Sequence, residues 1–148
     1  MGFPEYLSRH AEQNIARTPH IRGEEATKHA LVVPFIQLLG YDVFDPREVQ
    51  PEYTADFATK TRGQLEKIDY AIWKEGKAAI FVECKATTAE LADHDGQLSR
   101  YFNATPSVRV GVLTNGIRLK AFTGQRALAE ANRKATVGAM SHVQKSGL

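Results

Sequence analysis

The stretch that decides the fold is KIDYAIWKEGKAAIFVECK, residues 67–85. Residues 68–74 alternate as a β-strand does, with Ile68, Tyr70 and Ile72 on one side. Residues 78–83 are almost all apolar, which predicts a central strand buried on both faces. Glu75-Gly76-Lys77 separates the two runs, so the whole stretch is predicted to form a β-hairpin.

The open end of this hairpin carries two carboxylates and a lysine. If the turn is centred on Gly76, Asp69 and Glu83 are direct cross-strand neighbours, with Cβ atoms about 4.5–5.5 Å apart. Lys85 lies two residues beyond Glu83 and points to the same face. Two carboxylates this close repel unless a cation lies between them, and Mg2+ is a hard cation that takes such ligands. This register needs an odd number of loop residues, since a two-residue turn would place Asp69 on the other face.

The Glu-x-Lys pattern alone carries little weight. With eleven glutamates and nine lysines in the chain, about 0.7 copies are expected by chance. Glu75 and Lys77 form a second copy, in a turn where charge is solvated. Glu83 and Lys85 instead end an apolar strand, where an unpaired charge is costly. The alternative, a solvated rim of charge at the end of a strand, stays open on these residues alone.

The length and composition of the chain predict one globular domain. The chain has 148 residues, 43% of them hydrophobic and 24% charged, which is enough for a substantial core. A formal net charge of +2 neither requires nor excludes a nucleic-acid partner, because binding needs only a local basic surface. The single cysteine, Cys84, excludes an internal disulfide and fits the cytoplasm. Neither a signal peptide nor a membrane-spanning apolar run is found, so no membrane partner is expected.

The remaining elements follow from periodicity and turn residues. Helices are predicted at 4–16, 22–39 and 87–103, and strands at 41–44, within 49–57, at 108–114 and at 117–122. Pro34 should kink the second helix or split it in two, Thr87 with Glu90 matches a capping box, and Asn115-Gly116 marks a hairpin. This order predicts an α/β fold over residues 1–124, a mixed β-sheet flanked by helices. Residues 125–148 are predicted to form a C-terminal tail with some helical character.

Several motifs, in the hairpin and on both sides of it, resemble a known family in the same order and spacing. They are EEATKHALVVPFIQLLGYDVFDP (24–46), KIDYAIW (67–73), FVECK (81–85), GQLSRYF (96–102) and VGVLTNG (110–116). Together they resemble the N-terminal nuclease domain of type I restriction enzyme R subunits, within the PD-(D/E)XK nuclease superfamily. The proline that names the superfamily is absent, because Ile68 precedes Asp69, and many members share this departure.

The resemblance implies a restriction-endonuclease-like fold and a Mg2+-dependent endonuclease that hydrolyses DNA phosphodiesters, with Mn2+ as a substitute metal. Asp69 and Glu83 would bind the metal and take part in catalysis, and Lys85 would assist the attacking water. A helical glutamate would complete the metal site. Glu24 and Glu25 compete for this role, and we favour Glu24 because its spacing to the following threonine matches the family pattern. A first-turn glutamate that serves only the helix dipole is the alternative.

The same resemblance gives roles to the 96–102 segment. Gln97, counted among the catalytic residues, and Tyr101 lie one helical turn apart and would steady the site or the DNA backbone. Arg100 and Tyr101 are the predicted DNA-binding residues; Arg100 is a candidate phosphate contact from its residue type alone, and a solvated surface charge is the alternative. Without the resemblance, Gln97 and Tyr101 would be ordinary surface and core residues.

The family also implies partners and a setting. The implied setting is a restriction-modification or defence system, in which an ATP-dependent translocase and specificity and methylation subunits, none of them in this chain, choose the DNA. The alternative hypothesis is a catalytically inactive module on the same fold that binds nucleic acid or a partner protein. The intact set of Asp69, Glu83 and Lys85 argues against it, since a binding module has no need of two carboxylates facing a phosphate.

Overall fold

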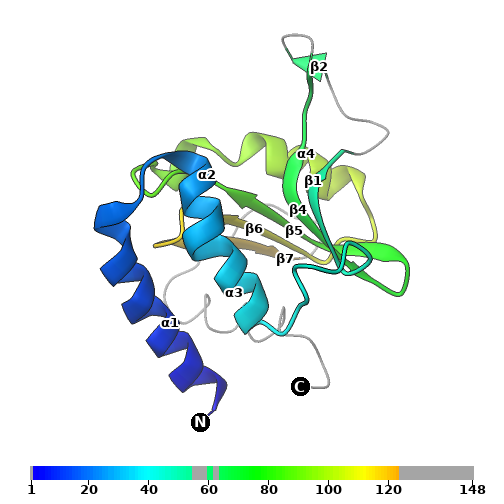
Figure 1. The fold of residues 1–148 in the computed structure, drawn as a ribbon. Coiled ribbons are helices and arrows are strands. Elements are labelled where there is room, and N and C mark those ends of the chain that lie inside the picture. The colour runs from blue at the N-terminus through cyan, green and yellow to red at the C-terminus, as the bar shows by residue number, and fades with distance from the viewer. Residues whose placement is uncertain (1, 55–59, 62–63, 124–148) are drawn as a thin grey trace.

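The computed structural model describes residues 2–54, 60–61 and 64–123, which form an α/β fold built on a five-stranded mixed sheet. The strand order is β1-β4-β5-β6-β7 (Figure 1). The strands are β1 (Val49–Tyr53), β4 (Ile68–Lys74), β5 (Lys77–Cys84), β6 (Val110–Thr114) and β7 (Leu119–Thr123). Only the β5–β6 pair is parallel; the other neighbours are antiparallel. The predicted fold class is thereby confirmed.

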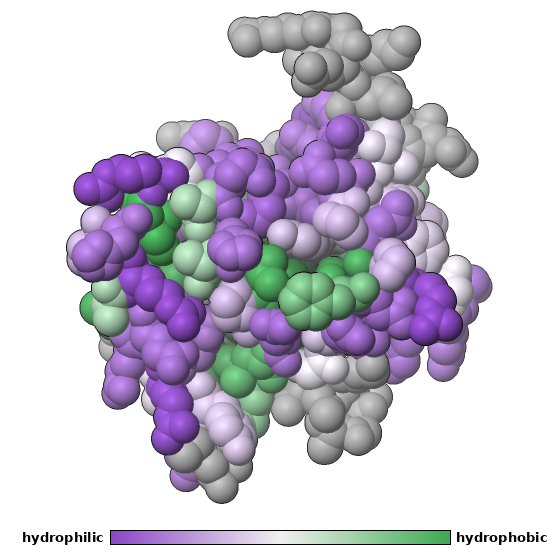
Figure 2. All heavy atoms as spheres, in the orientation of Figure 1, coloured by the Kyte–Doolittle hydropathy of each residue, from purple (hydrophilic) through white to green (hydrophobic). Residues whose placement is uncertain are grey.

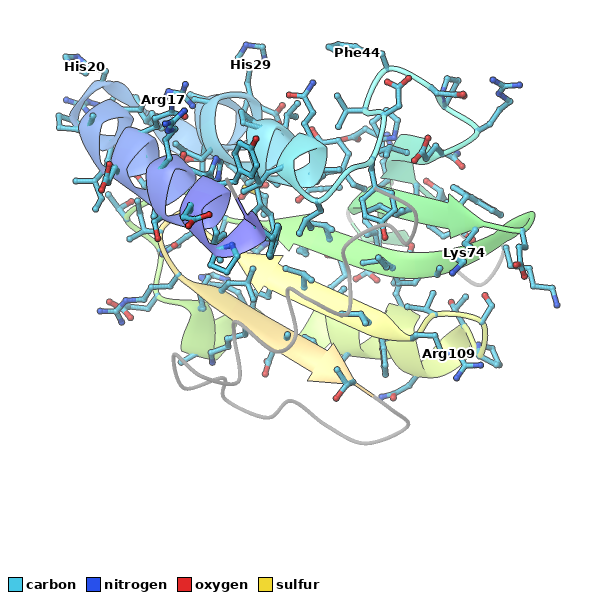
Figure 3. All side chains as sticks on the ribbon, turned by 90° about the horizontal axis from the view of Figure 1, so that it is seen from below. Arg17, His20, His29, Phe44, Lys74 and Arg109 are labelled. Atoms are coloured by element: carbon cyan, nitrogen blue, oxygen red, sulfur yellow. The ribbon has the colours of Figure 1, made fainter. Side chains whose placement is uncertain are left out.

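Helices cover both faces of this sheet. They are α1 (Phe3–Arg17), η1 (Thr18–His20), α2 (Gly23–Thr27), η2 (Lys28–Val32), α3 (Val33–Leu38), η3 (Leu91–Asp93) and α4 (Gly96–Ala104). Figure 3 shows the α1–α3 layer on one side of the sheet and α4 on the other.

In the described ranges no helix is both long and apolar enough to cross a membrane. Figure 2 shows hydrophilic residues over most of the outer face of the α1–α3 layer, with smaller hydrophobic areas near its centre.

The core accordingly has two parts. One lies under the α1–α3 layer and includes Phe35 and Ile36 with Tyr70 and Ile72 of β4. The other lies under α4 and combines its Leu98, Tyr101 and Phe102 with Ala71, Phe81, Leu113 and Phe122 of the sheet. Ile68 belongs to this second cluster rather than to the face of Tyr70 and Ile72, so the first residue of β4 breaks the predicted alternation.

The predicted helix at 22–39 is divided rather than merely kinked. A π-helical turn, η2, separates α2 from α3, and Pro34 stands in the first turn of α3. Proline has no N–H to give to the carbonyl of Ala30, four residues earlier. The Arg17 guanidinium donates to that carbonyl instead, at 3.2 Å. Turns of this kind often mark functional positions, and here η2 begins at Lys28.

The hairpin has the predicted pairing for a different reason. Lys74 pairs with Lys77, so the turn holds two residues, Glu75 and Gly76, with φ angles of 52° and 74°. A two-residue turn alone would place Asp69 on the wrong face. Between the pairs Trp73–Ala78 and Ile72–Ile80, however, β5 carries one extra residue, Ala79, as a β-bulge. The bulge shifts the register by one, so Tyr70 opposes Val82, and the same register carried one residue further sets Asp69 opposite Glu83.

Two sequence predictions are wrong. Residues 41–44 form turns and not a strand, because the Asp42 carboxylate accepts a hydrogen bond from the backbone N–H of Phe44 at 2.9 Å. The predicted helix at 87–103 begins only at Gly96. The Thr87 N–H donates to the hydroxyl of Thr27 at 3.2 Å, so Thr87 joins the α2 layer instead of capping a helix.

Other predictions are met in part. The Asn115-Gly116 hairpin forms, with Thr114 paired to Leu119. The extended piece within 49–57 is seen as β1, while residues 55–57 lie outside the described part of the chain. A small hairpin of β2 (Lys60–Thr61) and β3 (Gln64–Leu65), not predicted, projects from the body between β1 and β4 (Figure 1). The predicted tail at 125–148 also falls outside the described residues.

Candidate active site

Asp69 is the most tightly held carboxylate of the site. It is the second residue of β4 and is 8% exposed. Its Oδ2 accepts a hydrogen bond from the backbone N–H of Cys84 at 2.7 Å, across the strand pair. Its Oδ1 lies 2.7 Å from Nζ of Lys28. Both oxygens are therefore engaged, one by the β5 backbone and one by an ammonium group from the helical layer.

Glu83 lies beside it near the end of β5 and is 5% exposed. Its Oε2 accepts from the backbone N–H of Asp69 at 3.3 Å, and its Oε1 lies 3.6 Å from Nζ of Lys85. Burial and the nearby charge of Asp69 raise the pKa of Glu83 to about 8, and Lys85 opposes the shift only in part. Near neutral pH, Glu83 thus carries a proton in the absence of a bound cation.

The structure brings the predicted hairpin residues together. Asp69 and Glu83 are joined through the Asp69 N–H, and Lys85 lies on the Glu83 side of the pair. The Lys85 side chain is 22% exposed, so its ammonium group can meet both the buried carboxylate and solvent. A negatively charged ligand that approaches this end of the sheet would therefore meet a cation next to the two acids.

Lys28 was missed by the sequence reasoning. It is the first residue of η2 and is only 7% exposed. Its ammonium group lies 2.7 Å from Asp69 Oδ1, 2.9 Å from Glu25 Oε1 and 3.6 Å from Glu52 Oε1. Burial works to lower the pKa of Lys28, but the hydrogen bonds with Asp69 and Glu25 outweigh it and hold that pKa above its ordinary value. The one available signal was a lysine one helical turn after Glu24, just before the apolar part of the helix.

The two competing glutamates of α2 have different surroundings. Glu25 is bound to Lys28, and its side chain is 84% exposed. Glu24 instead acts on Glu83. Its negative charge raises the pKa of Glu83 further, by less than burial and the charge of Asp69 do. Glu24 is therefore within electrostatic reach of the Asp69–Glu83 pair, while Glu25 belongs to the ion-pair group of Lys28.

The predicted residues of α4 all hold the chain just before Asp69. Gln97 donates to the carbonyl of Lys67 at 2.5 Å, and the Tyr101 hydroxyl donates to the carbonyl of Glu66 at 2.5 Å. Arg100 forms an ion pair with the Glu66 side chain at 2.7 Å. Tyr101 is 1% exposed, so in this arrangement it steadies the site and offers no surface to DNA. The Arg100 side chain is 57% exposed and remains open to solvent.

The carboxylates of the site suit a hard divalent cation, although fewer than three metal-ligating side chains are gathered in the described residues. Asp69 and Glu83 provide carboxylate oxygens, the ligands that Mg2+ prefers, and the pKa of Glu83 is raised by its burial and by the neighbouring charge of Asp69. Within residues 2–54, 60–61 and 64–123, no three or more metal-ligating side chains are already gathered. His20 and His29 point away from the sheet (Figure 3), so the neighbouring histidines do not join the acids.

Comparison with protein families gives one match that bears on this site. The model of the type I restriction enzyme R protein N terminus matches residues 23–133. The matched range contains α2, η2, the whole hairpin and α4, and thus every residue of the site described above. Comparisons with curated proteins and with solved structures return no match.

Proposed function

This chain belongs to the family of type I restriction enzyme R protein N termini, and we propose on that basis that it is a Mg2+-dependent endonuclease domain that hydrolyses DNA phosphodiesters. The observation that carries the proposal is the buried pair of carboxylates, Asp69 and Glu83, with Lys85 beside it. Burial of two neighbouring carboxylic acids is unfavourable in the metal-free protein, and a metal-binding role would account for their presence here. This pair lies inside the matched region, at one end of the sheet.

Each residue has a defined task in this proposal. Asp69 and Glu83 hold the metal ion, and Glu24 supplies a further oxygen from α2. The ion, when bound, supplies a water molecule of lowered pKa and charge neutralisation at the phosphate. Glu83 gives up its proton on metal binding, because a ligating carboxylate must be ionised. Lys85 holds the attacking water and balances the negative charge that develops on the phosphate.

Two side chains of α4 support the backbone that leads into Asp69. Gln97 and Tyr101 bind two successive carbonyls, those of Lys67 and Glu66, immediately before β4. They fix the path of the chain that presents Asp69, which is a positioning role in catalysis. Arg100, whose side chain is 57% exposed, is proposed as a contact to a DNA phosphate.

The family places the domain in a restriction system. The proposed partners are DNA, an ATP-dependent translocase, and specificity and methylation subunits, which select the DNA that this site cuts. A cytoplasmic location follows from that role, since the DNA and these partners are there. The competing function is an inactive nuclease-fold module that binds DNA or a partner protein. The observation in its favour is the Lys28 ammonium group, which already occupies Asp69.

Cleavage of supercoiled plasmid with Mg2+ or Mn2+ tests the proposal. Asp69→Asn and Lys85→Ala should each lower the cleavage rate by at least about 100-fold. The chain offers a matched control in Glu75→Gln and Lys77→Ala, the second Glu-x-Lys copy, which lies in the turn. Both controls should cut like the wild type. Cutting that persists in Asp69→Asn and Lys85→Ala contradicts the proposed site, and DNA binding without cutting by the wild type favours the inactive module.

A further inference from the structure

We propose that Lys28 is the built-in counter-ion of Asp69, which a divalent metal ion must displace in order to bind. The inference rests on the proposed function, since it concerns the same metal site. It goes beyond it by giving a task to a residue of η2 in the metal-free protein. Lys28 is thus a positioning residue, which acts on the reaction through Asp69.

The contacts single out this lysine. Its Nζ lies 2.7 Å from Asp69 Oδ1, and no other ion pair reaches Asp69 within the described residues. Lys85 is a looser neighbour of the site, 3.6 Å from Glu83, with a side chain that is 22% exposed against 9% for Lys28. Of the two ammonium groups, that of Lys28 therefore lies closer to its carboxylate and belongs to the less exposed side chain.

Lys28 and a metal ion compete for one oxygen. Asp69 Oδ2 accepts a hydrogen bond from the Cys84 N–H and Oδ1 faces the Lys28 ammonium group, so a metal ion that bonds to Oδ1 meets Lys28 directly. Mg2+ binds carboxylate oxygens at about 2.0–2.1 Å and demands near-ideal geometry. A divalent cation bound at Oδ1 would lie close to the ammonium group that is 2.7 Å from this oxygen, and repulsion between the two charges in a buried site favours displacement of Lys28.

The structure also provides a place for the displaced ammonium group. Glu25 Oε1 lies 2.9 Å and Glu52 Oε1 lies 3.6 Å from Lys28 Nζ, and neither belongs to the proposed metal ligands. Their side chains are 84% and 55% exposed, so they face outward from the buried Asp69. Rotation of the Lys28 side chain toward these two acids would release Asp69 without leaving the ammonium group unpaired.

Two consequences follow for the free protein. With Lys28 in place, the charge of Asp69 is compensated and its carboxylate is oriented before any metal arrives. The same contact weakens metal binding, because the ion must replace a short hydrogen bond and ion pair. Loss of the Lys28 charge should therefore strengthen metal binding and at the same time lower the stability of the metal-free protein.

Titration of Mn2+ into the whole chain without DNA, followed by calorimetry and by the electron paramagnetic resonance signal of free Mn2+, tests this. Lys28→Met should bind Mn2+ at least about tenfold more tightly than the wild type, and Lys28→Arg no more tightly, because arginine keeps the charge. Lys28→Gln keeps a hydrogen-bond donor without the charge and serves as a second variant if Lys28→Met does not fold. Lys77→Met, at the exposed first residue of β5 beside the turn, is the matched control and should bind Mn2+ like the wild type.

The outcomes separate the two proposals. Equal or weaker Mn2+ binding by folded Lys28→Met or Lys28→Gln overturns the counter-ion role and leaves the metal site standing. Binding that is lost in Asp69→Asn shows that the titration reports this site. If neither the wild type nor the Lys28 variants bind Mn2+ in a manner that depends on Asp69, the metal-dependent function itself fails, and this inference fails with it.

Discussion

Glu83 should make the stability of the metal-free protein depend on pH in an unusual direction. Burial and Asp69 raise the pKa of Glu83 from 4.5 to about 8. Between these values the folded protein holds a proton on Glu83 that the unfolded chain has lost. Stability is therefore fully present below about pH 4.5 and is lost as the pH rises toward 8, with a slope of up to about 1.4 kcal/mol per pH unit. Over the whole interval the loss has an upper limit of about 5 kcal/mol, a large fraction of the stability of a small domain.

Urea unfolding in EDTA at intervals from pH 5 to pH 9 measures this loss, and Glu83→Gln should remove it. Glutamine is nearly isosteric and cannot ionise, so the variant should match or exceed the wild type near pH 8. His10 works in the opposite sense at lower pH, because burial lowers its pKa below 6.5 and its contribution to stability falls as the pH falls. The difference between the wild type and Glu83→Gln is therefore the quantity to compare. Glu75→Gln is the control and should keep the wild-type profile. A Glu83→Gln profile parallel to the wild type across this range would refute the reasoning.

Two further predictions concern the stability of the folded protein. Tyr101→Phe removes the hydrogen bond to the Glu66 carbonyl and should lower the free energy of unfolding by about 1–2 kcal/mol, measured by urea titration; an unchanged midpoint would contradict the bracing role. Gly116→Ala should cost about 2–4 kcal/mol, because a Cβ there would lie 2.4 Å from Leu31 Cδ1 at a φ of 82°. Gly23→Ala is its matched control, with a φ of 80° and no atom within 4 Å of the added Cβ, and should cost only about 1–2 kcal/mol.

The hairpin shows what the sequence can predict and where it stops. Alternation and the apolar run place β4 and β5 almost to the residue. The pairing of Asp69 with Glu83 was also predicted, but from an odd loop, whereas the protein combines a two-residue turn with a bulge at Ala79. Nothing in the letters of the sequence marks this bulge, because Ala79 is one small apolar residue among several. The two-residue turn and the bulge shift the register in opposite directions. Asp69 is therefore set opposite Glu83 as predicted, but not through the odd loop from which this was predicted.

Lys28 shows a second limit. Its partners Asp69 and Glu52 are distant in sequence and meet it only after α2 has packed beside the sheet. Local patterns describe the face of a helix but not which distant acid lies opposite. The same limit applies to Thr87, whose local capping signal is overridden by a tertiary hydrogen bond to Thr27. The resemblance supplies candidate site residues, which stay predictions, whereas the contact between Lys28 and Asp69 comes from the structure alone.

The central claim is that Asp69 and Glu83 together hold a divalent metal ion. Anomalous X-ray diffraction from crystals of this protein equilibrated with Mn2+ tests it most directly, with EDTA-treated crystals as the control. The expected result is an anomalous peak within ligand distance of both carboxylates, with the Lys28 ammonium group moved from Asp69 toward Glu25 and Glu52. Fully occupied Mn2+ at another place, or no peak between Asp69 and Glu83 at millimolar Mn2+, would contradict the claim.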